Sequence, residues 1–142
     1  LGAKDIDREE MVFLDKMGVR YITPYEIARQ GIHAVMKEAI EIVSTDTDAV
    51  YVSFDMDVLD CTIAPGTGIK TRGGLDYREV SYITHVIGDE LSAACLDIIE
   101  VNPLLDVRNQ TAELSVEILM GLLGVKYTTY EKNYLGLSRT LE

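Results

Sequence analysis

Apolar and polar positions follow two patterns along the chain, one typical of buried strands and one typical of helices. Residues 49–54 and 93–101 form short, nearly continuous apolar runs, as expected for strands that helices cover on both faces. From residue 31 the apolar positions instead follow a three- and four-residue spacing, which predicts a helix with one buried face. We interpret that stripe as core packing; it consists of Ile32, Val35, Met36, Ala39, Ile40 and Val43.

Two helix starts carry a capping-box pattern, in which the side chains of the N-cap residue and of the third helical residue each bond the other's backbone N–H. Thr23 with Glu26 begins one helix, with Pro24 at its first position. Asp76 with Glu79 begins another. Because the pattern is local, we expect each helix to begin at its box.

A short strand at residues 19–23 and a final helix at residues 109–123, ending at Gly124, complete the predicted elements. Strands that alternate with helices predict right-handed βαβ crossovers. The expected fold class is therefore α/β, with three layers and a mostly parallel sheet flanked by helices.

Two carboxylates, Asp55 and Asp57, directly follow the first apolar run. Side chains two residues apart on a strand point to the same face, so the pair is expected to project together at the carboxyl end of the strand, where parallel sheets place their ligands. Carboxylate oxygens suit Mg²⁺ or Mn²⁺. In the alternative interpretation the pair only caps the next turn by bonding nearby backbone amides.

Composition and charge exclude several classes of partner. A chain of 142 residues, 47% of them hydrophobic, is long enough for one core of ordinary size. Its net charge of -11 argues against nucleic acid or an anionic membrane as partner, and no apolar run approaches the roughly 18 residues of a membrane span. Cys61 and Cys95 are too few for a disulfide framework, which indicates reduced thiols and a cytoplasmic location.

Four motifs in a fixed order change the interpretation of the acidic pair. Together they resemble the ureohydrolase family of arginases and agmatinases, most closely an arginase, over about residues 1–124. Each motif alone would be weak, whereas their order and spacing are specific. The motifs are Asp-Met-Asp-Val-Leu-Asp at 55–60, Ala-Pro-Gly-Thr-Gly at 64–68, Gly-Gly-Leu-Asp-Tyr-Arg-Glu at 73–79 and Glu-Val-Asn-Pro at 100–103.

The resemblance implies a manganese-dependent hydrolase of guanidino compounds with two Mn²⁺ ions in each active site. Asp55 and Asp57 match two metal ligands of that family, and Glu100 matches the residue that holds the substrate guanidinium against the metals. Glu100 ends the second apolar run, so parallel strands would bring it to the same sheet edge as the aspartates. Without the motifs, Glu100 would be interpreted as a strand-end carboxylate in a salt bridge.

Further site predictions rest on the same resemblance. Asp7 matches a residue that contacts the substrate α-amino group, although alone it would be an ordinary helix-start acid. Arg78 and Glu79 match an oligomer contact and imply a trimer or hexamer, although Glu79 alone would simply cap its helix. Ile69 stands where the family usually has a threonine near the guanidinium, so the substrate preference stays open.

The resemblance covers only part of such an enzyme. Two earlier motifs of the family, Gly-Gly-Asp-His-Ser and Asp-Ala-His-x-Asp, do not occur here, and surface or partly buried roles are expected for His33 and His85. We therefore expect residues 1–125 to be the C-terminal part of an arginase-like α/β domain, inactive alone, with the missing N-terminal half as its partner. Residues 126–142 form a tail, either an interface arm or disordered.

Three functions follow. The first, favoured by Asp7, Glu100 and Asn102, is hydrolysis of L-arginine to L-ornithine and urea once the missing half is supplied. The second is hydrolysis of agmatine or another guanidino compound. The third is a non-catalytic fragment or interaction module that binds a partner through an open sheet edge.

Overall fold

The computed structural model describes residues 1–91 and 93–125 of the chain, so the predicted tail at residues 126–142 lies outside the described residues. No helix in these described ranges is long and apolar enough to cross a membrane. The elements in chain order are α1 (Arg8–Met17), α2 (Pro24–Gln30), α3 (Ile32–Ser44), β1 (Val50–Asp55), the 3-10 turn η1 (Met56–Val58), α4 (Tyr77–Glu90), β2 (Ala93–Ile99) and α5 (Gln110–Leu122).

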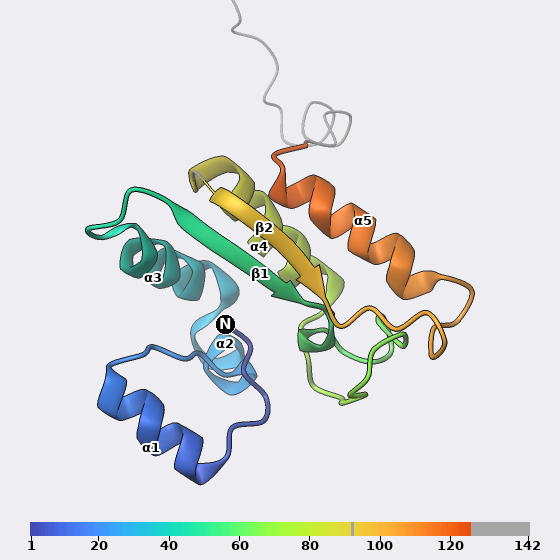
Figure 1. Cartoon of the computed structure of the whole chain (residues 1–142), viewed down its shortest axis with the longest axis horizontal. Coiled ribbons are helices and arrows are strands. Elements are labelled where there is room, and N and C mark those ends of the chain that lie inside the picture. The colour runs from blue at the N-terminus through green and yellow to red at the C-terminus, as the bar shows by residue number, and fades with distance from the viewer. Residues whose placement is uncertain (92, 126–142) are drawn as a thin grey trace, which may run out of the picture.

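The two strands form a parallel pair whose connection contains α4. Asp55 at the end of β1 lies opposite Ile99 at the end of β2. In Figure 1, α4 lies behind both strands, and it contacts α3 as well as α5. The alternation of apolar runs and helical stripes predicted this βαβ arrangement.

Side chains of β1 alternate between a covered face and an open face. Phe54 is buried and Val52 is half-buried, whereas Tyr51 is 60% exposed and Ser53 is also exposed. Helices from the described part of the chain thus cover one face of the strand. The apolar run had instead predicted that helices would cover both faces. An apolar run makes burial of both faces favourable, but a further layer must be present to provide it.

One apolar core joins the covered face of the sheet to the helices. The stripe predicted for α3 places Val35 and Met36 in this core, whereas Val43 near the helix end is exposed. Full burial of a large aliphatic side chain contributes about 1.5–3 kcal/mol. The buried hydrophobic residues are Ile22, Ile27, Val35, Met36, Phe54, Met56, Leu59, Ala64, Leu75, Val80, Ile83, Ile87, Leu114, Ile118 and Leu122.

Both predicted capping boxes are confirmed. At α2, the Glu26 N–H donates to Thr23 Oγ1 at 3.3 Å and the Thr23 N–H donates to Glu26 Oε2 at 3.0 Å. At α4, the Glu79 N–H donates to Asp76 Oδ1 and the Asp76 N–H donates to Glu79 Oε2, each at 2.9 Å. Reciprocal bonds of this kind satisfy backbone donors that a helix start leaves unpaired, so they fix where both helices begin.

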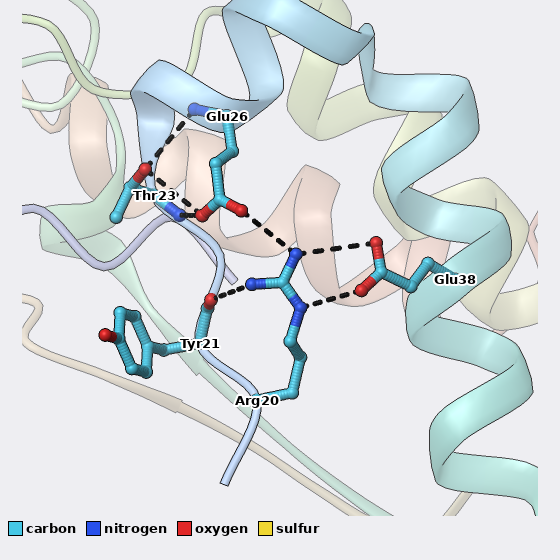
Figure 2. Close-up of polar contacts among 5 residues, drawn as sticks. All are labelled: Arg20, Tyr21, Thr23, Glu26 and Glu38. Carbon is cyan, nitrogen blue, oxygen red and sulfur yellow. Dashed lines mark hydrogen bonds and ion pairs between the residues drawn. The ribbon is translucent and has the colours of Figure 1, made fainter. Parts of the chain in front are cut away.

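The strand predicted at residues 19–23 was wrong, because this segment is a linker between α1 and α2. Side-chain contacts hold it in place of a strand ladder (Figure 2). The Arg20 guanidinium bonds Glu38 on α3 at 2.7 Å, Glu26 on α2 at 3.0 Å and the backbone carbonyl oxygen of Tyr21. Extended, apolar residues form a strand only when a neighbouring strand accepts their backbone hydrogen bonds.

Candidate metal and substrate site

Asp55 and Asp57 lie together at the carboxyl end of β1, but only one of them belongs to the strand. Asp55 is the last residue of β1, and Asp57 lies in η1. The Asp55 carboxylate accepts a 2.9 Å hydrogen bond from the Asp57 backbone N–H. The prediction that strand alternation aligns the pair was therefore wrong in its geometry, since a tight turn brings the two carboxylates together. The expectation that an aspartate here caps the next turn is confirmed, and this cap leaves other carboxylate oxygens for a ligand.

The surroundings of Asp57 disfavour its negative charge. Burial raises the pKa of Asp57 most, and the adjacent Asp55 carboxylate raises this pKa further. Glu100 acts in the same direction, whereas the Lys4 ammonium opposes them. Two further carboxylates and one ammonium thus act on Asp57, and a bound divalent cation would offset the excess negative charge.

Lys4 was not identified from the sequence. Its ammonium donates to the backbone carbonyl oxygens of Asp57 and Leu59, the second at 3.4 Å. Because Lys4 and Asp57 are 53 positions apart in the sequence, no local spacing indicated this contact. It joins the start of the chain to the turn that carries the acidic pair.

A cavity of about 290 Å³ lies beside the two aspartates. Residues 1–5 form part of its wall, together with Ile69 and Thr71. Ile69 is 61% exposed, and the Thr71 hydroxyl is buried without a hydrogen-bond partner in residues 1–91 and 93–125. The cavity therefore offers carboxylates and an apolar wall, which suits a ligand with a cationic group on an aliphatic stem.

Glu100 directly follows β2 at the sheet edge where the sequence placed it. Since the strands are parallel and Asp55 lies opposite Ile99, Glu100 is at the same edge as the aspartate pair. Its backbone φ is 60°, in the left-handed region. A Cβ added to Gly68 would lie 3.2 Å from Glu100 Oε2, so a glycine at this position leaves room for the carboxylate.

Hydrogen bonds tie the Gly-rich loop to the segment after β2. The Asn102 N–H donates to the Gly66 carbonyl oxygen at 2.7 Å, and the Gly66 N–H donates to Thr111 Oγ1 at 2.7 Å. Asp106 packs so closely on Gly66 that an added Cβ would lie 2.6 Å from its side chain. These contacts hold the backbone that follows Glu100 against the Gly-rich loop.

The structure does not bring Asp7, Arg78 or Glu79 to this cavity. Asp7 is exposed at the start of α1 and makes no side-chain capping bond, and in Figure 1 that helix lies away from the strand ends. Arg78 is exposed in the first turn of α4, where Glu79 bonds the Asp76 backbone. The capping function of Glu79 is therefore confirmed, while its oligomer contact stays a prediction.

The two histidines have partners away from the acidic pair. His33 Nδ1 is hydrogen-bonded to the Tyr82 hydroxyl, with ring centroids 5.3 Å apart, and His85 Nδ1 bonds the Ser81 carbonyl oxygen at 2.6 Å. Within the described ranges, no three His, Cys, Asp or Glu side chains form a group that could hold a metal ion. The aspartate pair fits a hard divalent cation by its donor chemistry, but it supplies only part of a ligand set.

The chain is similar to known proteins in sequence and in fold. An arginase of Brevibacillus brevis is 37% identical over 126 residues, which are 89% of this chain and 42% of that protein. The crystal structure of Bacillus caldovelox arginase superposes with a TM-score of 0.85 at 36% identity, over 89% of this chain and 42% of that one. A formimidoylglutamase of Bacillus subtilis superposes with a TM-score of 0.79 at 30% identity, over 84% of this chain and 37% of that one.

The α/β fold predicted from the sequence is the fold of these structures. The chain spans less than half the length of the relatives that it matches, 42% for the first of them. The model of the Arginase family matches residues 1–124. Sequence, fold and family model agree, and the chain belongs to the arginase family.

Proposed function

We propose that this chain supplies part of the active site of a manganese-dependent hydrolase that converts L-arginine to L-ornithine and urea. The convergence of Asp55, Asp57 and Glu100 at one sheet edge carries this proposal. Because the chain spans only 42% of a matching arginase, the remaining metal ligands would come from the N-terminal half of the complete enzyme. The chain alone is expected to be inactive.

Each site residue has a distinct proposed task. Asp55 and Asp57 would hold the two Mn²⁺ ions together with ligands from the N-terminal half, and such ions lower the pKa of bound water so that hydroxide forms near neutral pH. Glu100 would accept paired hydrogen bonds from the planar guanidinium and orient its carbon. Asp7 would contact the α-amino group, which requires that the substrate reach α1 in the complete enzyme.

The assembly and location follow the same proposal. Arg78 on the exposed side of α4 and the neighbouring Glu79 would contact another subunit of a homo-oligomer, a trimer or hexamer. A cytoplasmic location is supported by Cys61 and Cys95, which are both free thiols.

A second candidate substrate is agmatine or another guanidino compound. The observation behind this alternative is the residue at position 69, Ile69. This side chain lies on the cavity wall and is 61% exposed, so it presents methyl groups where a threonine would present a hydroxyl. The lost hydroxyl would have contacted the guanidinium, which all these substrates share, so position 69 does not select for the α-carboxylate of arginine.

Urea release tests the proposal. The chain is incubated with Mn²⁺ and either arginine or agmatine, alone and together with a polypeptide that corresponds to the N-terminal half of a matching arginase. We expect arginine-dependent urea only in the combined sample, and a loss of at least about 100-fold in Glu100→Gln, because the neutral amide cannot make the charge-assisted pair with the guanidinium.

The control for this variant is Glu113→Gln, which removes the same charge from the exposed first turn of α5 and should keep full activity. Faster turnover of agmatine than of arginine would reassign the substrate. Absence of urea in every combination, with the two polypeptides shown to bind each other, would support the non-catalytic interaction module instead.

A further inference from the structure

We propose that Lys4 is a positioning residue of the acidic site, which holds the turn that carries Asp57 in place through hydrogen bonds to two backbone carbonyl groups. This inference rests on the proposed function of that site. Lys4 differs from the proposed metal-binding and substrate-binding residues, because its hydrogen bonds go to the backbone carbonyl oxygens of Asp57 and Leu59.

The contacts of the Lys4 ammonium define this task. It bonds the carbonyl oxygens of Asp57 and Leu59, which flank Val58 within and just after η1. A 3-10 turn of three residues satisfies few of its own carbonyl groups. One ammonium has three donors, so it can hold two carbonyls at once and fix their relative orientation.

The segment that carries Lys4 is itself closely packed on this turn. Gly2 is buried and has φ 75°, and a Cβ added to it would lie 2.4 Å from Val58 Cγ2. No other residue fits both the left-handed backbone and the short distance. Lys4 therefore extends from backbone whose distance from η1 is fixed.

A second set of bonds anchors this segment from the other side. The N–H groups of Gly2 and Ala3 both donate to the Ile22 carbonyl oxygen, at 2.7 and 3.1 Å. Ile22 lies in the linker that Arg20 holds through Glu26 and Glu38 (Figure 2). A continuous chain of contacts thus supports Asp57. It runs from Arg20 with its partners Glu26 and Glu38, through the linker, to residues 2–4.

Two backbone hydrogen bonds made by this turn and the residues after it report whether the turn keeps its position. The Leu75 N–H donates to the Val58 carbonyl oxygen at 3.0 Å, and the Asp60 N–H donates to the Leu75 carbonyl oxygen at 3.0 Å. If Lys4 holds this turn, loss of its ammonium should expose these two amides to exchange with solvent while the strands stay protected.

Amide hydrogen exchange of the full chain, followed by NMR, tests the proposal without requiring activity. In Lys4→Met we expect the Leu75 and Asp60 amides to exchange about tenfold faster, as for the loss of hydrogen bonds to a charged donor. Amides in β1 and β2 should keep their rates. Lys4→Arg, which restores a charged donor, should recover most of the protection.

Lys37→Met is the matched control, because it removes the same charge and keeps a similar unbranched side chain at an exposed position of α3. Equal exchange at Leu75 and Asp60 in Lys4→Met and Lys37→Met would overturn the proposal. A faster exchange spread evenly over all elements, without recovery in Lys4→Arg, would overturn it too, because Lys4 would then support general stability alone.

The unsubstituted chain gives a measurement that does not depend on the folding of any variant. Protons of the Lys4 ammonium should exchange with water about tenfold more slowly than those of Lys37, because two carbonyl oxygens hold them. Equal rates would contradict the proposal directly.

Kinetics of the assembled enzyme distinguish positioning from substrate binding. Lys4→Met should lower kcat and leave KM within about twofold, because Lys4 makes no proposed substrate contact. If the unsubstituted enzyme releases no urea, the proposed function fails, whereas the exchange rates still decide whether Lys4 holds the turn.

Discussion

At the scale of single residues, Asp55 combines two tasks that an isosteric change can separate. Its carboxylate caps η1 by accepting the Asp57 N–H, and we propose that it also binds metal. An asparagine keeps an oxygen acceptor for the cap but loses the negative charge. The cap contributes to the stability of the fold, and the charge contributes to the proposed metal binding. One substitution should therefore affect stability and activity differently.

Asp55→Asn is therefore expected to leave the free energy of unfolding within about 0.5 kcal/mol of the unsubstituted chain. In the assembled enzyme it should lower urea release by at least about 100-fold, since even groups that only orient a metal ligand are worth about 10–100-fold. Chemical denaturation and manganese content measured beside the activity separate the two effects.

The control for Asp55→Asn is Asp46→Asn, an equal charge change in an exposed turn whose φ of 55° asparagine tolerates. If Asp55→Asn unfolds the chain while Asp46→Asn does not, the carboxylate charge is needed for folding, and a separate metal role loses its support.

Asp60 gives a pH-dependent prediction. Hydrogen bonds from the Thr62 hydroxyl, the Thr62 N–H and the Gly73 N–H lower the pKa of Asp60 from 3.8 to about 2. A carboxylate whose pKa is lowered by folding stabilises the fold above its unfolded pKa, and this contribution is lost as the pH falls through the folded value.

The stability difference between the unsubstituted chain and Asp60→Ala should thus be constant near neutral pH and shrink as the pH falls from 3.8 towards about 2. Urea denaturation at a series of pH values measures it. A difference that grows towards acid would show that Asp60 does not stabilise the fold through its charged form.

At the scale of elements, α4 and α5 approach each other at two glycines. A Cβ added to Gly88 would lie 2.4 Å from the Gly121 carbonyl oxygen and 2.9 Å from the Gly124 backbone nitrogen. These neighbours are backbone atoms, so a side-chain rotation cannot relieve the contact. The close packing of the two helices therefore depends on the absence of a side chain at position 88.

Gly88→Ala tests this packing by the sign of its effect. In an exposed helix the change would stabilise by up to about 1 kcal/mol. Here the added methyl group must separate α4 from α5, so we expect a loss of about 1–3 kcal/mol in the free energy of unfolding, measured by chemical denaturation. The control Lys37→Ala, at an exposed helical position, should change the free energy of unfolding by less than about 0.5 kcal/mol. A Gly88→Ala chain that is more stable than the unsubstituted chain would mean that the helices are not in such close contact.

At the scale of the whole molecule, the sheet has a face that the described helices leave open. Tyr51 is 60% exposed on this face, and its hydroxyl donates to the Asp97 carboxylate on β2. The other oxygen of Asp97 is buried without a hydrogen-bond partner in the described residues. An apolar cavity of about 280 Å³ also lies between α3, β1 and α4. These features predict that the chain associates with other polypeptides.

We accordingly expect the purified chain to self-associate as its concentration rises, because exposed strand backbone and apolar surface favour pairing. Light scattering measures this association. Tyr51→Lys should reduce it, since a lysine adds charge to the open face and can still bond Asp97. A chain that is monomeric at every concentration, with no N-terminal half present, would contradict the prediction.

The sequence by itself determined the features that depend on neighbouring residues. Both capping boxes were predicted correctly, because hydrogen bonds between residues three positions apart decide them, and α5 was predicted to within one residue at each end. The apolar runs located β1 and β2, although β2 ends at Ile99, two residues before the end of the predicted run. Glu100 was placed at the correct sheet edge, because parallel strands bring their carboxyl ends together.

Only the tertiary structure decided the rest. Residues 19–23 have the apolar pattern of a strand, but the ion pairs of Arg20 and the lack of a neighbouring strand in the described residues made them a linker. The turn at Asp57, and not strand alternation, brought the acidic pair together. The contact of Lys4 with Asp57 spans 53 residues, and a contact of that kind depends on how distant segments pack, which no local pattern of residues encodes.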